Sequence, residues 1–322
     1  ITCSKRAKTP LPAHIKLDEY QHSAKVDSTT YRSMIGAVLY ASGATRPDVT
    51  FAISKLSQYS ADPRLVHMNA LKRLIRYMMN TCEYKMIYTK TGKLPAVQAY
   101  ADASFGSDLK TGKSISGYLI FIAGAPVLWM SKRQRCVTTS TSESEYVALS
   151  GACREIIYIH GMLTELGLER ILLNKTGAPP EIKLGCDSAS AIAVSEKPGL
   201  SLKSRSIRIS YHNVRSCVKE KLIKLVKVKG TENPADMLTK PLPKTLHYSH
   251  LSRMFPGFVR EYINLAMISH NDDDDGIPED VSENPSDDAE PENKTQEPSS
   301  GSRAPVDIKL QNLQGMSEHR EP

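Results

Sequence analysis

Apolar residues recur with the period of a helix in three stretches near the start of the chain. The first stretch covers about residues 28–42, and the second begins after residues 45–48, which interrupt the helical pattern. Together the three stretches predict a small helical module over residues 28–83. Residues 1–27 are polar and contain two prolines, so we expect an extended lead-in there.

The third helical stretch has a clear predicted start. Asp62 and Pro63 suit the N-cap and the first helical position. The residues after them divide into an apolar face with Met68, Leu71, Ile75 and Met78 and a basic face with Lys72, Arg73 and Arg76. We therefore expect the apolar face to be buried and the basic face to point outward.

From Tyr84 the pattern changes to short runs rich in Val, Ile and Tyr. The predicted strands cover residues 96–103, 117–123, 127–130, 182–186 and 221–228. The predicted helices cover residues 142–166, 188–194, 211–220 and 234–239. The first three strands form an antiparallel meander, and the later elements alternate between helix and strand. This order predicts an α/β (α+β) fold in which helices pack on a mixed sheet.

The formal charge of +7 is unevenly distributed. Residues 271–322 carry 15 acidic and 4 basic side chains, a net charge of −11, so the preceding residues carry +18. The acidic segment has little apolar content and is predicted to be disordered. The densest basic segment spans residues 203–229 and includes Lys203, Arg205 and Arg208. Clustered Lys and Arg bind phosphates by releasing counterions, so we expect a nucleic-acid partner.

Six scattered cysteines without a C-x-x-C pair, and the lack of a visible signal peptide, favour an intracellular protein with reduced thiols. The longest apolar run, residues 115–130, is broken by Gly124 and Pro126, so we expect no membrane span. The first residue is Ile, which suggests a piece of a longer chain.

Four acidic residues stand where predicted strands end or helices begin: Asp102, Glu145, Asp187 and Asp236. Burial of an unpaired carboxylate is costly, and converging carboxylates repel one another unless a divalent cation holds them. Carboxylate oxygens suit Mg²⁺ or Mn²⁺, and two such ions about 3.5–4 Å apart serve in-line attack on a phosphodiester. Their positions thus fit nuclease chemistry.

Each acid also has a structural alternative. Ser142 and Glu145 have capping-box spacing, and Asp187 could cap the helix that follows it. Asp236 could lie in the first turn of its helix because the helix dipole favours an acid there. Asp102 could be a surface residue at a strand edge. Spacing alone does not choose between these possibilities.

Sequence motifs add what spacing lacks. The strings YADASFGSD, TSTSESEYVALS, CDSASAIAV and KGTENPADMLTKPL resemble the ribonuclease H domain of copia-type LTR retrotransposon Pol polyproteins. Upstream, KTPLP, YRSMIGAVLYASGATRPDVTFAISKLSQYSADP and HMNALKRLIRYMMNT resemble the segment that connects the reverse transcriptase to this domain. The resemblance covers roughly residues 5–250 in collinear order. It implies a ribonuclease-H-like mixed five-stranded sheet with flanking helices over residues 84–250, preceded by the helical module. Residues 251–322 lie beyond the resemblance and are predicted to form a C-terminal extension.

The resemblance also implies a site. By motif, the metal ligands are Asp102, Glu145, Asp187 and Asp236, which would hold two Mg²⁺ ions, with Mn²⁺ as a substitute. Asp102 would contact both ions, Glu145 and Asp187 would complete one metal site and help to orient the attacking water, and Asp236 would complete the other. The implied activity is endonucleolytic cleavage of the RNA strand of an RNA·DNA hybrid, in partnership with the reverse transcriptase portion of the same polyprotein.

Three serines are candidates for contact with the substrate. Ser104, Ser140 and Ser188 lie near the acids in sequence and could contact 2′-hydroxyl groups across the minor groove. The family's mobile histidine before the last Asp is missing from residues 230–234. A polymerase site is not expected, because no Tyr-x-Asp-Asp hairpin is present. The alternative to an enzyme is a retroelement relic or accessory domain that binds nucleic acid without cutting it.

Overall fold

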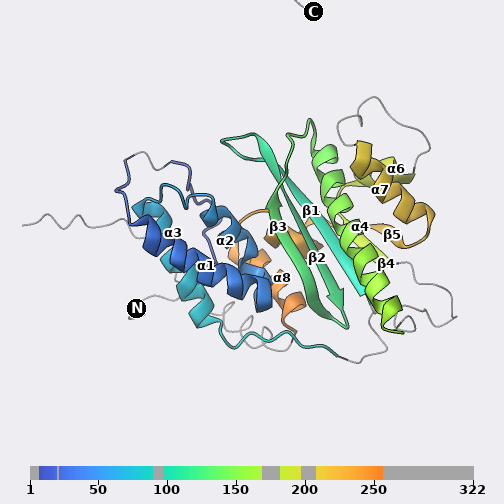
Figure 1. The fold of residues 1–322 in the computed structure, drawn as a ribbon, viewed down its shortest axis with the longest axis horizontal. Helices are drawn as coiled ribbons and strands as arrows, with labels where there is room; N and C mark the ends of the chain where they lie inside the picture. The colour runs from blue at the N-terminus through green and yellow to red at the C-terminus, as the bar shows by residue number, and fades with distance from the viewer. Residues whose placement is uncertain (1–6, 20–21, 90–96, 169–181, 197–207, 257–322) are drawn as a thin grey trace, which may run out of the picture. The chain divides into compact units, whose positions relative to one another are not determined.

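The computed structural model describes residues 7–19, 22–89, 97–168, 182–196 and 208–256 (Figure 1). All of them belong to one compact unit of the chain. The predicted acidic tail, Lys203 and Arg205 lie outside the described residues, and of Arg208 only the backbone is described. Within the described ranges, no helix is both long and apolar enough to cross a membrane.

Helices come first in the chain, as predicted. They are α1 (Ser28–Thr45), the 3₁₀ turn η1 (Pro47–Val49), α2 (Thr50–Ser57) and α3 (Leu65–Asn80). Their shared core also includes Leu11 and Leu17, so the predicted lead-in packs against the helices. The prediction that the basic face of α3 points outward is wrong for Arg73. This side chain is buried and donates to Thr9 Oγ1 (3.3 Å).

The start of α3 also differs from the prediction. The helix begins at Leu65, because residues 63–65 first pair with residues 24–26 in extended form: Val26 N donates to Pro63 O (3.3 Å) and Leu65 N to Ala24 O (2.8 Å). Asp62, the predicted N-cap, instead forms an ion pair with Arg64 at 2.7 Å. Tertiary pairing therefore overrides the local Asp-Pro signal.

The five strands form one mixed sheet. They are β1 (Val97–Asp108), β2 (Lys113–Ile122), β3 (Ala125–Arg133), β4 (Ile182–Cys186) and β5 (Ile223–Lys227), in the order β3-β2-β1-β4-β5. The first three pair antiparallel, whereas β4 runs parallel to β1 and β5 parallel to β4. The predicted mixed five-stranded sheet with an antiparallel meander is confirmed.

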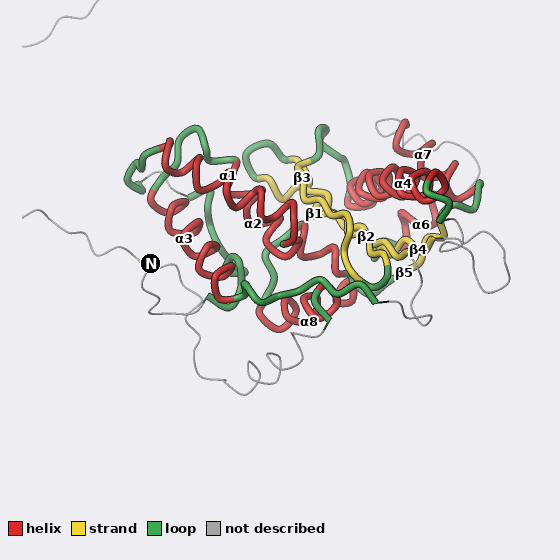
Figure 2. Tube along the Cα trace, turned by 60° about the horizontal axis from the view of Figure 1, so that its bottom comes forward, coloured by secondary structure: helices red, strands yellow, loops and turns green. Residues whose placement is uncertain are grey.

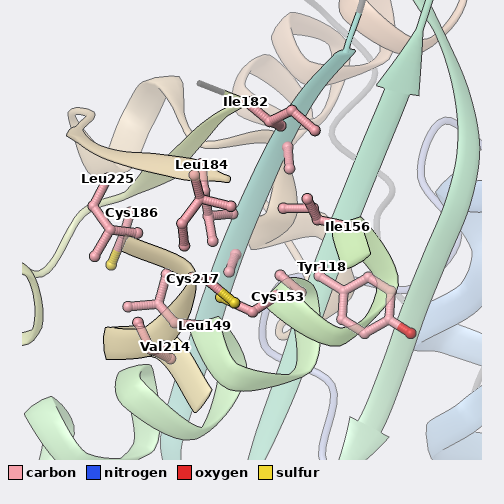
Figure 3. Packing of buried hydrophobic residues seen from close by; sticks show 14 of the residues in the cluster. Tyr118, Leu149, Cys153, Ile156, Ile182, Leu184, Cys186, Val214, Cys217 and Leu225 are labelled. Atoms are coloured by element: carbon pink, nitrogen blue, oxygen red, sulfur yellow. The ribbon is translucent and has the colours of Figure 1, made fainter. Parts of the chain in front are cut away.

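Helices cover both faces of the sheet (Figure 2). On one face, α4 (Thr141–Glu165) packs against β1 and β2, with α6 (Ala189–Glu196) and α7 (Arg208–Lys219) beside it. Alternate β1 residues, Ala99 and Ala101 among them, point into this core, which also contains Cys153 and Cys217 (Figure 3). The other face carries the 3₁₀ turn η4 (Pro234–Leu238) and the helix α8 (Lys244–Met254). The short 3₁₀ turn η3 (Gly230–Glu232) precedes η4 in the chain.

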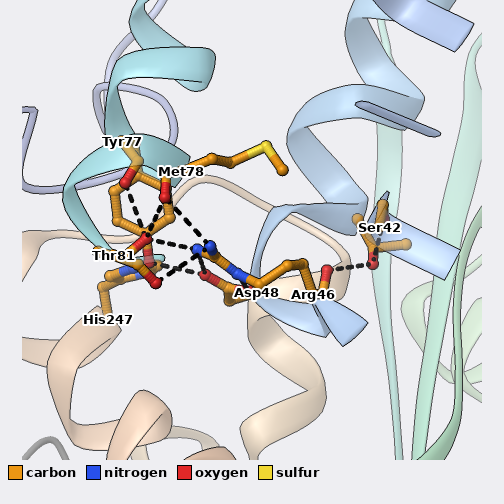
Figure 4. Close-up of polar contacts among 8 residues, drawn as sticks. Ser42, Arg46, Asp48, Tyr77, Met78, Thr81 and His247 are labelled. Atoms are coloured by element: carbon orange, nitrogen blue, oxygen red, sulfur yellow. Dashed lines mark hydrogen bonds and ion pairs between the residues drawn. The ribbon is translucent and has the colours of Figure 1, made fainter. Parts of the chain in front are cut away.

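A buried polar network joins the helices to α8 (Figure 4). Arg46 donates to both carboxylate oxygens of Asp48, at 2.9 and 2.7 Å, and to Thr81 Oγ1 at 2.6 Å. The Tyr77 hydroxyl donates to Asp48 Oδ2 (2.8 Å) and lies 3.0 Å from His247 Nε2. Buried charges are tolerated here because every one has a partner.

Candidate active site

Asp102 lies in the central strand β1, and only 2% of its surface is exposed. The structural alternative for Asp102, a surface residue at a strand edge, is therefore wrong. Its partner across the ladder is Gly117 of β2. A Cβ at Gly117 would lie 2.7 Å from Leu238 Cβ and 2.9 Å from Thr239 Cγ2, closer than packing permits. The missing side chain thus allows η4 to pack directly beside Asp102.

The turn η4 brings Asp236 to the same place. Asn233 is its N-cap: Oδ1 accepts from Ala235 N (3.2 Å), and Nδ2 donates to the Ala101 carbonyl of β1 (2.9 Å). This one side chain both starts the turn and ties it to the strand. Asp236 does lie in the first turn, as the dipole alternative expects, and is buried.

Thr239 and Lys240, which directly follow η4, contact these two acids. The Thr239 hydroxyl donates to Asp102 Oδ2. The Lys240 ammonium lies 3.0 Å from Asp236 Oδ1 as an ion pair. Burial, and next the charge of Asp102, raise the pKa of Asp236 to about 7, although Lys240 acts in the opposite direction. Sequence reasoning missed Thr239 and Lys240, because their roles depend on how η4 packs.

Glu145 is free of the capping role that its sequence spacing allowed. Ser140 is the N-cap of α4 and accepts from Glu143 N (3.2 Å), while Glu143 Oε2 accepts from Thr139 N (2.6 Å). Only 3% of Glu145 is exposed, and its Oε2 has no hydrogen-bond donor. Burial raises the pKa of Glu145 to about 9, and the charges of Asp102 and Asp187 add to the effect.

Asp187 directly follows β4 and is half-buried. It does not cap α6, because Ser188 Oγ accepts from Ala191 N (3.2 Å) in that role. Burial, and next the charge of Asp102, raise the pKa of Asp187. The Lys227 ammonium donates to the main-chain oxygen of Asp187 (2.7 Å) and leaves the carboxylate to face the other acids.

The four predicted acids therefore come together as two neighbouring pairs. Glu145 and Asp187 form one pair; with Cys186 they offer ligand atoms that all lie within 4.8 Å of one another. Asp102 and Asp236 form the other pair, held by Thr239 and Lys240, and Asp102 raises the pKa of the three other acids. Cys186 was not predicted as part of the site, although it immediately precedes Asp187.

The three predicted substrate-binding serines lie at a cavity wall and at two helix starts. Ser104 lines a cavity of about 210 Å³ together with Thr239 and Lys240. Ser140 and Ser188 cap α4 and α6, and the two helix starts are joined through Ser190 Oγ, which lies 3.0 Å from Ser188 Oγ and accepts from Ser142 Oγ (2.9 Å). Contact of these serines with a substrate stays a prediction.

The chain is similar in sequence to transposon polyproteins. No protein-family model matches the chain. The chain is 33% identical over 247 residues to the retrovirus-related Pol polyprotein from transposon TNT 1-94 of Nicotiana tabacum, covering 75% of this chain and 18% of the polyprotein. For the Pol polyprotein from transposon RE1 of Arabidopsis thaliana, identity is 32% over 251 residues, covering 78% of this chain and 16% of the polyprotein. The chain thus spans less than a fifth of their length.

One further protein matches over a shorter part of the sequence, and one solved structure aligns with the fold. Secreted RxLR effector protein 161 of Plasmopara viticola is 41% identical over 129 residues, which are 40% of this chain and 90% of the effector. Among solved structures, a ribonuclease H1 isolated from compost aligns over 45% of this chain and 94% of its own, with 16% identity and a TM-score of 0.34. On the sequence matches and the confirmed sheet, the chain belongs to the family of copia-type retrotransposon Pol polyproteins and contains a ribonuclease-H-like domain.

Proposed function

We propose that this domain is a ribonuclease H that cleaves the RNA strand of RNA·DNA hybrids by metal-dependent hydrolysis. The observation that supports it is the convergence of four acids from separate segments, close enough for the charge of Asp102 to raise the pKa of the other three: Asp102, Glu145, Asp187 and Asp236. Such a cluster is costly unless cations neutralise it. Glu145 and Asp187 are not the caps of the neighbouring helices, since Ser140 caps α4 and Ser188 caps α6.

The donor set fits divalent magnesium. All four side chains offer carboxylate oxygens, and Glu145 Oε2 is buried without a donor, so a cation would satisfy it. The charge of Asp102 acts on all three other acids, so Asp102 would contact both ions, with Glu145 and Asp187 on one and Asp236 on the other. When bound, Mg²⁺ or Mn²⁺ supplies charge neutralisation and lowers the pKa of water for attack on the phosphodiester.

The chain's own residues orient this set. The Thr239 hydroxyl fixes the rotamer of Asp102 through Oδ2, and Asn233 ties η4 to β1 so that Asp236 cannot drift away. Lys240 supplies a positive charge beside Asp236, which reduces repulsion between the acids before metal binds. Such supporting contacts keep metal ligands in place.

For the substrate, we propose an RNA·DNA hybrid recognised by its shape. Ser104, Ser140 and Ser188 would contact 2′-hydroxyl groups across the minor groove, and Lys203, Arg205 and Arg208 would contact phosphates. The reverse transcriptase portion of the same polyprotein is the proposed partner, because it produces hybrids.

The test is a cleavage assay with Asp102→Asn. We expect Mg²⁺-dependent cleavage of a labelled hybrid to fall more than about 100-fold, because even indirect partners of a metal contribute 10–100-fold. Hybrid binding at low salt should persist. Asp108→Asn is the matched control: Asp108 lies on the same strand and is buried, but it accepts from Arg133 and Thr111, away from the acid pairs.

The outcomes separate the hypotheses. Unchanged cleavage by Asp102→Asn would overturn the proposal. A wild-type protein that binds hybrid with salt-sensitive affinity but cuts it in neither Mg²⁺ nor Mn²⁺ would instead be a nucleic-acid-binding relic or accessory domain.

A further inference from the structure

A thiol lies among the acids of the candidate site. Cys186 is the last residue of β4, and its side chain is fully buried. Its Sγ, a Glu145 carboxylate oxygen and an Asp187 carboxylate oxygen all lie within 4.8 Å of one another. Ser188 N donates to Cys186 Sγ (3.3 Å), which holds the sulfur in this position at the turn into α6.

The second observation is the unsatisfied oxygen of Glu145. Glu145 is more than nine-tenths buried, and its Oε2 has no donor within the described part of the chain. Asp102, by contrast, accepts from Thr239, and Asp236 is paired with Lys240. A buried acceptor without a donor is costly, so the Glu145 side of the site has ligand capacity that the protein itself leaves unused.

We propose that Glu145, Cys186 and Asp187 form a binding site for a thiophilic divalent cation of the zinc(II) or cadmium(II) class. Magnesium prefers oxygen ligands, whereas zinc accepts one sulfur and two carboxylate oxygens readily. Three protein ligands leave a fourth tetrahedral position for water.

The geometry needs only a small adjustment. With bonds of about 2.0–2.3 Å, ligand atoms on a tetrahedral zinc lie roughly 3.5 Å apart. The present spacing of at most 4.8 Å is closed by rotation of the side chains around the ion. On binding, a sulfur–metal bond forms and the thiol proton leaves to solvent with any proton on Glu145; no oxidant or reductant takes part.

Occupation of this site has a consequence for catalysis. Glu145 and Asp187 are also proposed magnesium ligands, so the softer ion would displace one Mg²⁺ and inhibit cleavage. This consequence rests on the proposed function, whereas binding of the softer ion does not.

The test uses the full, untagged chain, from which all metal has been removed. Cadmium(II) is the probe that is added to it. Titration is followed by calorimetry and by the ultraviolet charge-transfer band of a cadmium–thiolate bond. Cys186→Ser should lose the tightest binding step and its band, with an affinity loss of at least about 10–100-fold. Cys136→Ser, which removes an exposed cysteine, is the matched control and should bind as the wild type does.

A second variant covers the case in which Cys186→Ser does not fold. Glu145→Gln keeps every cysteine and should also weaken cadmium binding by at least about tenfold. Wild-type cadmium affinity in either folded variant would overturn the inference. If the wild type cleaves hybrids, zinc should inhibit it at lower concentration than it inhibits Cys186→Ser. If the wild type does not cleave, the proposed function fails and the cadmium titration still decides this site.

Discussion

At the scale of single residues, Glu145 has the most unusual environment of the four acids. Its carboxylate is buried next to two other acids, and one of its oxygens has no donor. The protein therefore favours the protonated form, with a pKa of about 9. A bound cation reverses that preference, because metal ions bind the ionised carboxylate. This residue links metal binding to the pH dependence of stability.

The first prediction concerns pH without metal. The folded-state pKa of Glu145 is about 9 against an ordinary value of 4.5, so between these values the folded state holds more protons than the unfolded one. Stability should therefore fall as pH rises through this window, by up to about 1.4 kcal/mol per pH unit for one such group. Thermal unfolding in EDTA at about pH 5, 7 and 9 measures it. If the stability of Glu145→Gln fell with pH as steeply as that of the wild type, Glu145 would not be the cause of the pH dependence.

The second prediction adds magnesium to the same measurement. Mg²⁺ should raise the Tm more at about pH 9 than at about pH 5, because protons compete less for the carboxylates. Asp236, with a pKa raised to about 7, should contribute the same trend between its ordinary value of 3.8 and neutrality. Asp108→Asn should keep this response, since Asp108 lies outside the acid pairs. An Mg²⁺ effect that does not change with pH would argue against these ligands.

At the scale of secondary-structure elements, the contact of η4 with β2 assembles the second acid pair. Gly117→Val should displace η4, because a Cβ there would meet Leu238 Cβ at 2.7 Å and the Ala235 carbonyl at 3.2 Å. We expect a loss of about 1–3 kcal/mol of stability together with weaker Mg²⁺ binding, measured by urea unfolding and calorimetry. Gly161→Ala is the control: it lies in α4 with open space around it and should be neutral or stabilising. Wild-type magnesium affinity in Gly117→Val would show that η4 is not required.

Sequence patterns predicted elements where local signals agree with the tertiary structure. The strands and α4 followed their periods, and β4 matches its predicted range, residues 182–186. The helix α8 was missed because two of its four buried residues, His247 and His250, are not apolar and so hide the helical period. Spacing also could not show that four distant acids meet; that expectation came from the motifs. The contributions of Gly117 and Cys186 depend on packing between elements that lie far apart in the chain.

At the scale of the whole molecule, the helices and the sheet are joined by specific polar contacts. Trp129 Nε1 of β3 donates to the Ser42 carbonyl of α1 (3.0 Å), and Ser54 of α2 donates to the Ser131 carbonyl (3.2 Å). The network around Tyr77 links α3 to α8 as well. The predicted division between a helical module and a second domain near residue 83 stays a prediction, but these contacts imply that both parts unfold together.

Tyr77→Phe tests this link. It removes the hydroxyl that donates to Asp48 and lies 3.0 Å from His247, and it should cost about 1–3 kcal/mol, because a buried acceptor loses its donor. Fluorescence of Trp129, the single tryptophan, and far-ultraviolet circular dichroism should report one coincident transition. Tyr40→Phe, at an exposed tyrosine, is the control. Separate transitions by the two probes would show two independent folding units.

The contact between Thr239 and Asp102 spans 137 positions of the chain, and that between His247 and Tyr77 spans 170. A polypeptide that grows from its amino end on the ribosome therefore exposes the antiparallel meander long before it can close either contact. Products of premature stop codons between residues 133 and 236 would contain the three strands of the meander but lack Asp236. Such a stop codon would thus remove one acid of the proposed nuclease site, although the antiparallel meander would still be translated.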